Sequence, residues 1–127
     1  MARILLLEDN LELSEAIVLA LQRAGYEVLS AADGQSGQNL LTENQFDLVI
    51  SDIVMPGADG LEVLFSLRKK TPTLPVIAMS GGGRLPAEVY LRFAESGGAC
   101  STLRKPFRLA ELVDLVRAKL PPPATSP

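Results

Sequence analysis

Short apolar runs that alternate with amphipathic stretches are the feature that most constrains the fold of this 127-residue chain. The runs lie at residues 3–7, 27–31, 48–52, 76–79 and 100–103. Apolar residues at helical spacing predict helices at about 10–24, 34–43, 61–70, 87–96 and 109–120. Five strands that alternate with five helices, roughly twenty to twenty-five residues apart, predict an α/β fold built on a doubly wound parallel sheet.

Acidic side chains stand where two of the predicted strands end. Glu8 and Asp9 follow the first strand, and Asp52 ends the third. In the flavodoxin-like strand order 2-1-3-4-5 the first and third strands are neighbours, and ligands bind beyond the carboxyl ends of the strands. We therefore predict that the three carboxylates meet at one edge of the sheet. Taken singly, Asp52 could be a turn former, and Glu8-Asp9 could be a charge pair at a helix N-terminus.

The charges expected at this edge do not balance. Lys105 follows the fifth strand, so three negative charges face one positive charge, a sum of -2. One divalent cation would balance that sum, and carboxylate oxygens without a nearby imidazole or thiolate favour a hard ion such as Mg²⁺. Taken alone, Lys105 would be an ordinary surface lysine.

Composition excludes several other classes of protein. The chain has one cysteine and no histidine, which rules out an intramolecular disulfide, a Cys/His zinc site and a histidine-based catalytic triad. A net charge of -3, with the basic residues scattered, argues against direct binding of nucleic acid. The apolar run that ends at Leu7 is too short for a signal peptide or a membrane span, so we expect a cytoplasmic protein without a membrane partner.

Four motifs, in this order and at these intervals, resemble the receiver domain of two-component response regulators, a CheY-like family. They are Glu8-Asp9-Asn10, the run Asp-Ile-Val-Met-Pro-Gly-Ala-Asp-Gly at 52–60, Ser80-Gly81, and Lys105-Pro106-Phe107. The resemblance covers about residues 2–120. It implies a signalling switch of a phosphorelay, in which Asp52 accepts a phosphoryl group from a histidine kinase, a histidine phosphotransfer protein or a small phosphodonor.

The resemblance also implies a role for each residue of the site. Asp9, Asp52 and the backbone carbonyl of Val54 would ligate Mg²⁺, and Glu8 would act through a bound water. Lys105 would contact the phosphoryl group, and Ser80 would form a hydrogen bond with it. In this family the peptide bond between Lys105 and Pro106 is usually cis. The domain would not be an enzyme beyond its own phosphorylation and dephosphorylation.

The chain departs from the family in two places near the fourth helix. Thr102 stands where receivers commonly carry Tyr or Phe, and the segment from Ser80 to Lys105, which includes Gly81 to Gly83, is a few residues longer than usual. We therefore expect signalling through a modified fourth-helix region, or through the first helix and the loops near Asp52. Tyr90 and Phe93 could contact a partner there, although helical spacing favours core packing for both, and Cys100 is expected to be buried.

Other functions remain as alternatives. Glu8-Asp9 would repel the phosphate of a nucleotide or flavin, and Val54 cannot supply the acid that an aspartyl-phosphate phosphatase needs. A pseudo-receiver would keep the fold and bind partners without being phosphorylated. We expect a receiver domain at residues 1–120 and a proline-rich tail or linker at 121–127, so the chain would be a stand-alone receiver or part of a larger regulator. Its downstream protein partner is not indicated by the sequence.

Overall fold

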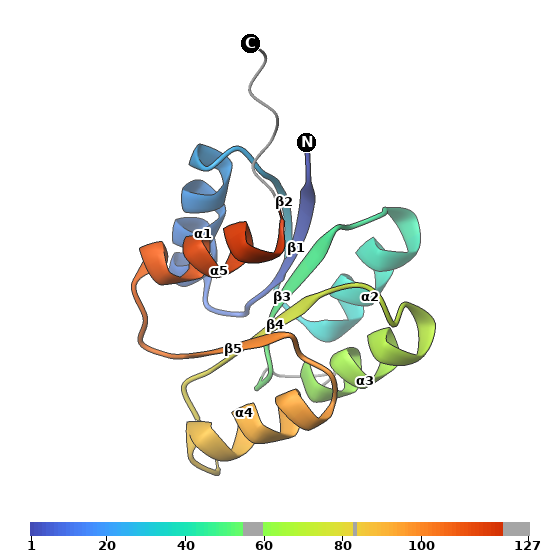
Figure 1. Cartoon of the computed structure of the whole chain (residues 1–127), viewed down its shortest axis with the longest axis vertical. Coiled ribbons are helices and arrows are strands. Elements are labelled where there is room, and N and C mark those ends of the chain that lie inside the picture. Colours follow the sequence, from blue (N-terminus) through green and yellow to red (C-terminus); the bar gives the residue numbers. More distant parts are fainter. Residues whose placement is uncertain (55–59, 83, 121–127) are drawn as a thin grey trace.

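A five-stranded parallel sheet forms the centre of the computed structural model, which describes residues 1–54, 60–82 and 84–120. Its strands lie in the order β2-β1-β3-β4-β5, as predicted (Figure 1). Their bounds are β1 Arg3–Leu7, β2 Glu27–Ala31, β3 Leu48–Asp52, β4 Val76–Ser80 and β5 Ser101–Arg104.

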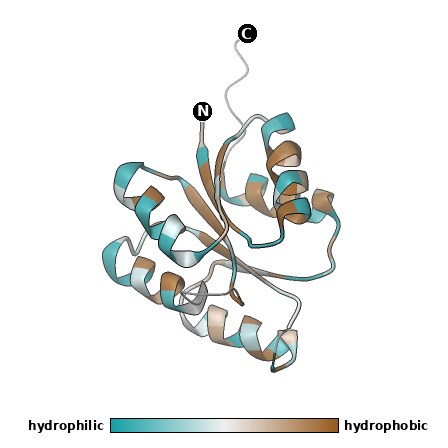
Figure 2. Ribbon diagram, turned by 180° about the vertical axis from the view of Figure 1, so that it is seen from behind, coloured by the Kyte–Doolittle hydropathy of each residue, from teal (hydrophilic) through white to brown (hydrophobic). Residues whose placement is uncertain are grey.

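Helices cover both faces of this sheet. They are α1 Leu11–Arg23, α2 Gly34–Glu43, α3 Gly60–Lys70, α4 Ala87–Ser96 and α5 Leu109–Lys119. Helices α1 and α5 lie on one face, and α2, α3 and α4 lie on the other (Figure 1). In Figure 2 the strands are largely apolar while the outer sides of the helices are hydrophilic. The predicted α/β architecture is therefore confirmed.

The apolar core is divided by the sheet into two clusters. On the α1 and α5 side, β-strand residues such as Ile4 and Ile50 pack with Leu112 and Val116 of α5. On the other side, residues such as Val49 pack against α3 and α4. The central strands are buried on both faces, as continuous apolar runs in a parallel sheet require.

Two helix starts follow the capping signals in the sequence. The side chain of Asn10 accepts a hydrogen bond from the backbone N–H of Leu13 (3.0 Å), and that of Asp33 accepts one from Ser36 (2.7 Å). Part of the 52–60 motif, residues 55–59, lies outside the described residues, as does the predicted tail at 121–127. No helix within the described ranges has the length and apolar character needed to cross a membrane.

Helix α2 turns glycines toward the sheet, and the structure gives the reason for one of them. Gly37 is buried, and a Cβ added to it would overlap the side chain of Leu7 in β1. A bare backbone at this position lets the helix approach the sheet closely. Close packing of the backbone thus takes the place of larger apolar side chains.

Two of the expectations for the fourth-helix region are wrong. The side chain of Phe93 is 51% exposed, because Ala94, which is fully buried, occupies the centre of the face that α4 turns to the sheet. Cys100 is exposed, because β5 begins one residue later, at Ser101. Tyr90 does pack against the core, as expected.

Candidate functional site

The carboxyl ends of the strands bring the predicted polar residues to one edge of the sheet. Asp52 and Ser80 are the last residues of β3 and β4, and Lys105 follows β5 directly. Glu8 follows β1 in the same way. The register aligns Leu7 with Ser51 and Asp52 with Met79, so these ends lie at the same level.

Three carboxylates meet at this edge, as the strand order predicted. One oxygen each from Glu8, Asp9 and Asp52 lies within 4.8 Å of the others. Glu8 and Asp52 are 2% and 5% exposed, whereas Asp9 is open to solvent. The cluster therefore has a buried floor and an accessible side.

Lys105 bridges the two buried carboxylates. Its Nζ lies 2.5 Å from Oε1 of Glu8 and 2.8 Å from Oδ2 of Asp52. The second oxygen of each carboxylate accepts a backbone hydrogen bond, Glu8 from Asn10 (3.1 Å) and Asp52 from Val54 (3.0 Å). Charge-assisted hydrogen bonds of this kind fix the orientation of both carboxylates.

Two features of the local backbone accompany the position of Lys105. The Lys105–Pro106 peptide bond is cis. The backbone of Gly81 lies against the lysine stem, since a Cβ added to Gly81 would be 3.2 Å from Cβ of Lys105. Ser80-Gly81 was one of the motifs in the sequence, but no role for Gly81 beside Lys105 was predicted from it.

The pKa values of Glu8 and Lys105 are set by burial and by the contacts between them and Asp52. Burial raises the pKa of Glu8, and the neighbouring Asp52 carboxylate adds to that effect, whereas hydrogen bonds from Lys105 and Asn10 oppose it. Burial alone would lower the pKa of Lys105. Hydrogen bonds to Asp52 and Glu8, together with their charges, outweigh burial and raise it. Lys105 is therefore held as a cation while the surplus charge falls on the carboxylates.

Ser80 lies on the β4 side of the same edge. It is fully buried, and its Oγ accepts a hydrogen bond from the backbone N–H of Gly82 (3.0 Å). Thr102, where an aromatic residue was expected from the family, is half-buried, and its hydroxyl donates to Oε1 of Glu95 in α4 (3.4 Å). The structure thus joins Glu8, Asp9, Asp52 and Lys105 in one cluster and directs Ser80 toward the loop after β4.

A hard divalent cation fits the donors that this cluster offers. All of the donors are carboxylate oxygens, and their local charge with Lys105 is -2, from three negative groups and one positive group. The exposed side at Asp9 leaves room for further oxygen ligands. The arrangement can therefore hold a cation and a phosphate oxygen beside a buried carboxylate.

Comparison with known proteins gives consistent matches over nearly the whole chain. Residues 4–117 match the family model described as "Response regulator receiver domain". The transcriptional regulatory protein TctD of Salmonella typhimurium is 40% identical over 118 residues, which cover 93% of this chain and 51% of TctD. The chain spans about half the length of the first curated relatives it matches.

Solved structures agree with the sequence matches. A response regulator receiver domain protein from Clostridium thermocellum superposes with a TM-score of 0.85 at 31% identity, covering 94% of both chains. The response regulator TrrA from Thermotoga maritima, solved in complex with Mg²⁺-BeF, gives a TM-score of 0.83 at 31% identity, covering 94% of this chain and 100% of TrrA.

Proposed function

This chain belongs to the family of response regulator receiver domains, and we propose that it is a phosphoacceptor switch in which Asp52 receives the phosphoryl group. The observation that carries the proposal is the bridge from Lys105 to Asp52 and Glu8, with Asp9 within 4.8 Å. A buried acceptor beside a fixed cation and an accessible acidic cluster suits phosphoryl transfer, which asks a protein mainly for position and positive charge.

The transfer itself is a simple exchange of bonds at phosphorus. A carboxylate oxygen of Asp52 forms a new bond to phosphorus while the bond to the donor breaks, and its electron pair leaves with the donor. For a histidine kinase or a histidine phosphotransfer protein the broken bond is to an imidazole nitrogen. For an acyl phosphate such as acetyl phosphate, the broken bond is to the oxygen that joins phosphorus to the acyl group, which leaves as a carboxylate.

Each residue of the site has a role in this proposal. Hydrogen bonds from Lys105 and from Val54 N–H hold the Asp52 carboxylate in place, and Lys105 offers positive charge to the arriving phosphoryl oxygens. Ser80 would turn its hydroxyl from Gly82 toward the phosphoryl group, since that group adds negative charge and draws in a donor.

Magnesium is the cation that we propose for the acidic cluster. Receiver domains bind Mg²⁺ at an acidic pocket, and this chain offers Glu8, Asp9 and Asp52 at the matching place. We assign direct ligation to Asp9, to Asp52 and to the carbonyl of Val54, and a water-mediated contact to Glu8. When bound, Mg²⁺ supplies positive charge to the oxygens of the transferring group.

We also propose the limits of the domain. A boundary at residue 120 is supported by Leu120, which is buried and whose carbonyl accepts a hydrogen bond from the Tyr26 hydroxyl (3.2 Å). Residues 1–120 then form the receiver domain, and 121–127 a tail or linker. The upstream partner is a phosphohistidine protein, and the downstream partner is a protein that reads the changed surface.

The test is intact-mass measurement after incubation with acetyl phosphate, with and without Mg²⁺. We expect wild type to gain one phosphoryl group only with Mg²⁺, and Asp52→Asn to gain none. Asp114→Asn is the matched control, because it removes an exposed carboxylate from α5 and should leave the gain unchanged.

A second measurement shows whether the site binds Mg²⁺ even if acetyl phosphate does not phosphorylate Asp52. Mg²⁺ titration followed by NMR should shift the backbone amides near Asp9 and Asp52. Absence of both the mass gain and these shifts would show that the chain is a pseudo-receiver, and the proposed roles would then be wrong.

A further inference from the structure

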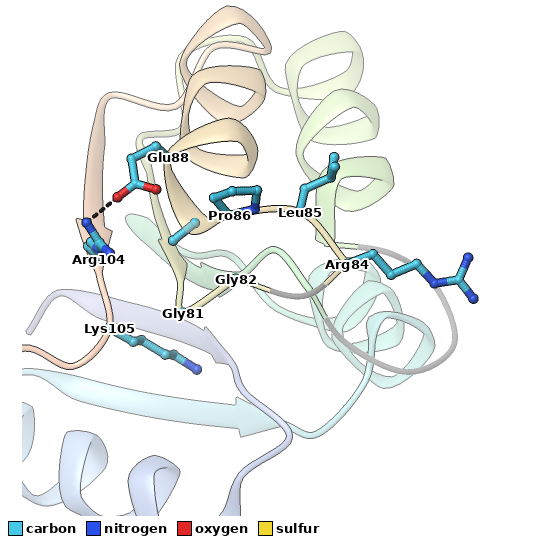
Figure 3. A pocket seen from close by; sticks show the side chains of 9 residues that line it. Gly81, Gly82, Arg84, Leu85, Pro86, Glu88, Arg104 and Lys105 are labelled. Carbon is cyan, nitrogen blue, oxygen red and sulfur yellow. Dashed lines mark ion pairs between the residues drawn. The ribbon is translucent and has the colours of Figure 1, made fainter.

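An ion pair joins the start of α4 to the end of β5. The guanidinium of Arg104 contacts Oε1 of Glu88, in the first turn of α4 (Figure 3). Arg104 precedes Lys105 in the chain and is the register partner of Ser80 in the neighbouring strand. It is therefore adjacent to both residues that we propose to contact the phosphoryl group, to Lys105 along the chain and to Ser80 across the sheet.

Ser80 and Arg104 also share a face of the sheet. Residues aligned in a parallel ladder direct their side chains to the same side, and alternate residues of a strand do so as well. Thr102 and Arg104 of β5 both reach α4, through Glu95 and Glu88. The start and the end of α4 are thus each joined to β5 by a polar contact.

The loop after Ser80 connects Ser80 to the start of α4, which the Glu88–Arg104 pair joins in turn to β5. Ser80 Oγ accepts the N–H of Gly82, and a Cβ added to Gly82 would lie only 3.3 Å from the backbone nitrogen of Ala87, the first residue of α4. Rotation of the Ser80 side chain away from Gly82 breaks that hydrogen bond at the point where the backbone passes close to the start of α4. The Glu88–Arg104 pair holds the same end of α4.

The surroundings of the Glu88–Arg104 ion pair allow it to open. A cavity of about 560 Å³ lies beside the ion pair and is lined by Gly81, Gly82, Glu88 and Arg104, among others (Figure 3). The side chains of Arg104 and Glu88 are 64% and 51% exposed. Exposed pairs stabilise a fold only weakly, so this pair can bias a switch without locking it.

We propose that Glu88 and Arg104 are positioning residues that set the affinity of the site for a phosphoryl group. Their ion pair holds the start of α4 against β5, which keeps the loop in place and the Ser80 hydroxyl on Gly82. Opening the pair lets Ser80 turn toward Asp52 more easily and strengthens phosphoryl binding. The proposal rests on the proposed function, because it concerns the regulation of the same site.

The test uses beryllofluoride with Mg²⁺ as the probe, with binding to Asp52 followed by NMR. The decisive variant is the double substitution Glu88→Gln/Arg104→Gln, which removes the pair and leaves the local net charge unchanged. We expect it to bind the probe two- to fivefold more tightly than wild type. A fivefold gain corresponds to about 1 kcal/mol, the upper end for an exposed pair. Arg104→Lys, which keeps a cation opposite Glu88, should stay within about twofold of wild type.

A structural signature accompanies the change in affinity. Hydrogen exchange at the Gly82 amide should be faster in the double variant without the probe, since its acceptor on Ser80 is held less firmly. The control is Asp114→Asn/Arg117→Gln, which removes one charge of each sign from exposed positions of α5 and should change neither measurement.

The outcomes distinguish this proposal from the proposed function. If wild type binds the probe and the double variant binds it equally tightly or more weakly, the ion pair does not restrain the site and the positioning role is wrong. An equal gain in the α5 control would overturn it as well. If wild type itself does not bind the probe, the proposed function fails, and this proposal fails with it.

Discussion

Replacing Lys105 by methionine should destabilise the fold more than any other single loss of charge at the site. The lysine Nζ contacts carboxylates of Glu8 and Asp52 whose side chains are 0% and 8% exposed. Removing one partner of a buried ion pair typically costs 3 to 5 kcal/mol, because the remaining charge is left without compensation. The side chain of Lys105 is itself 20% exposed, so we expect the lower end, about 3 kcal/mol.

The dependence of this loss on pH gives a second, sharper prediction for the same variant. The pKa of Glu8 is already raised, chiefly by burial, and loss of the Lys105 contacts should raise it further. A carboxyl whose folded pKa is raised favours the fold fully below its unfolded value of 4.5, and that contribution is lost as pH rises through the folded pKa. The deficit of Lys105→Met should therefore be largest near neutral pH and shrink toward pH 5.

Deprotonation of Lys105 at high pH should reduce the stability difference between wild type and Lys105→Met. The pKa of Lys105 is raised by its two carboxylate partners, despite burial, so its stabilising contribution is fully present below the unfolded value of 10.5. That contribution is lost as pH rises through the folded pKa. The difference between wild type and variant should then fall again in strong base.

Urea unfolding followed by far-ultraviolet circular dichroism is the assay, because the chain has no tryptophan. It should be run without divalent cations, at neutral pH and near pH 5. Lys119→Met, at an exposed position of α5, is the control and should change stability by less than about 0.5 kcal/mol. A variant as stable as wild type at neutral pH, or a deficit that does not shrink near pH 5, would refute the reasoning.

Three further predictions test the fold itself. Gly37→Ala should lower stability by about 1 to 3 kcal/mol in thermal unfolding, because the new Cβ overlaps the buried Leu7 side chain; an unchanged melting temperature would contradict this. Tyr26→Phe should cost about 1 kcal/mol through loss of the buried hydrogen bond to the Leu120 carbonyl, and an unchanged melting temperature would show that this bond is not stabilising. Cys100 should react with one equivalent of a thiol reagent without denaturant, whereas reaction only after unfolding would mean that the thiol is buried.

Most of the site's geometry could be predicted because it depends on patterns that are local in the sequence. Apolar runs predicted the strands, and apolar residues at helical spacing predicted the helices, two of which are capped by Asn10 and Asp33. Once strands one and three were taken as neighbours, Glu8 and Asp52 had to meet, since parallel strands end at the same edge. Side-chain roles at the site remain predictions.

The wrong prediction for Phe93 arose because the exposure of a helical side chain depends on which side of the helix packs against its neighbours. Helical spacing placed Phe93 in the core, but neighbouring residues on a helix differ by about 100° in direction. Ala94 takes the buried position, and Phe93 is turned outward. The Glu88–Arg104 ion pair could not be predicted either, because it needs the register of β5 on β4 and the position of α4 at once.

Arg104 and Lys105 show how two adjacent cations acquire different tasks from their surroundings alone. The lysine follows the strand into the site and is held between two buried carboxylates, so its loss leaves charges that solvent cannot screen. The arginine, one residue earlier, faces α4 and pairs with a carboxylate that is more than half exposed, so its loss changes stability little (Figure 3). A strongly held cation suits a permanent part of the site, and a weakly held one suits a contact that opens. The same segment of chain therefore holds the acidic cluster together through Lys105 and joins α4 to β5 only weakly through Arg104.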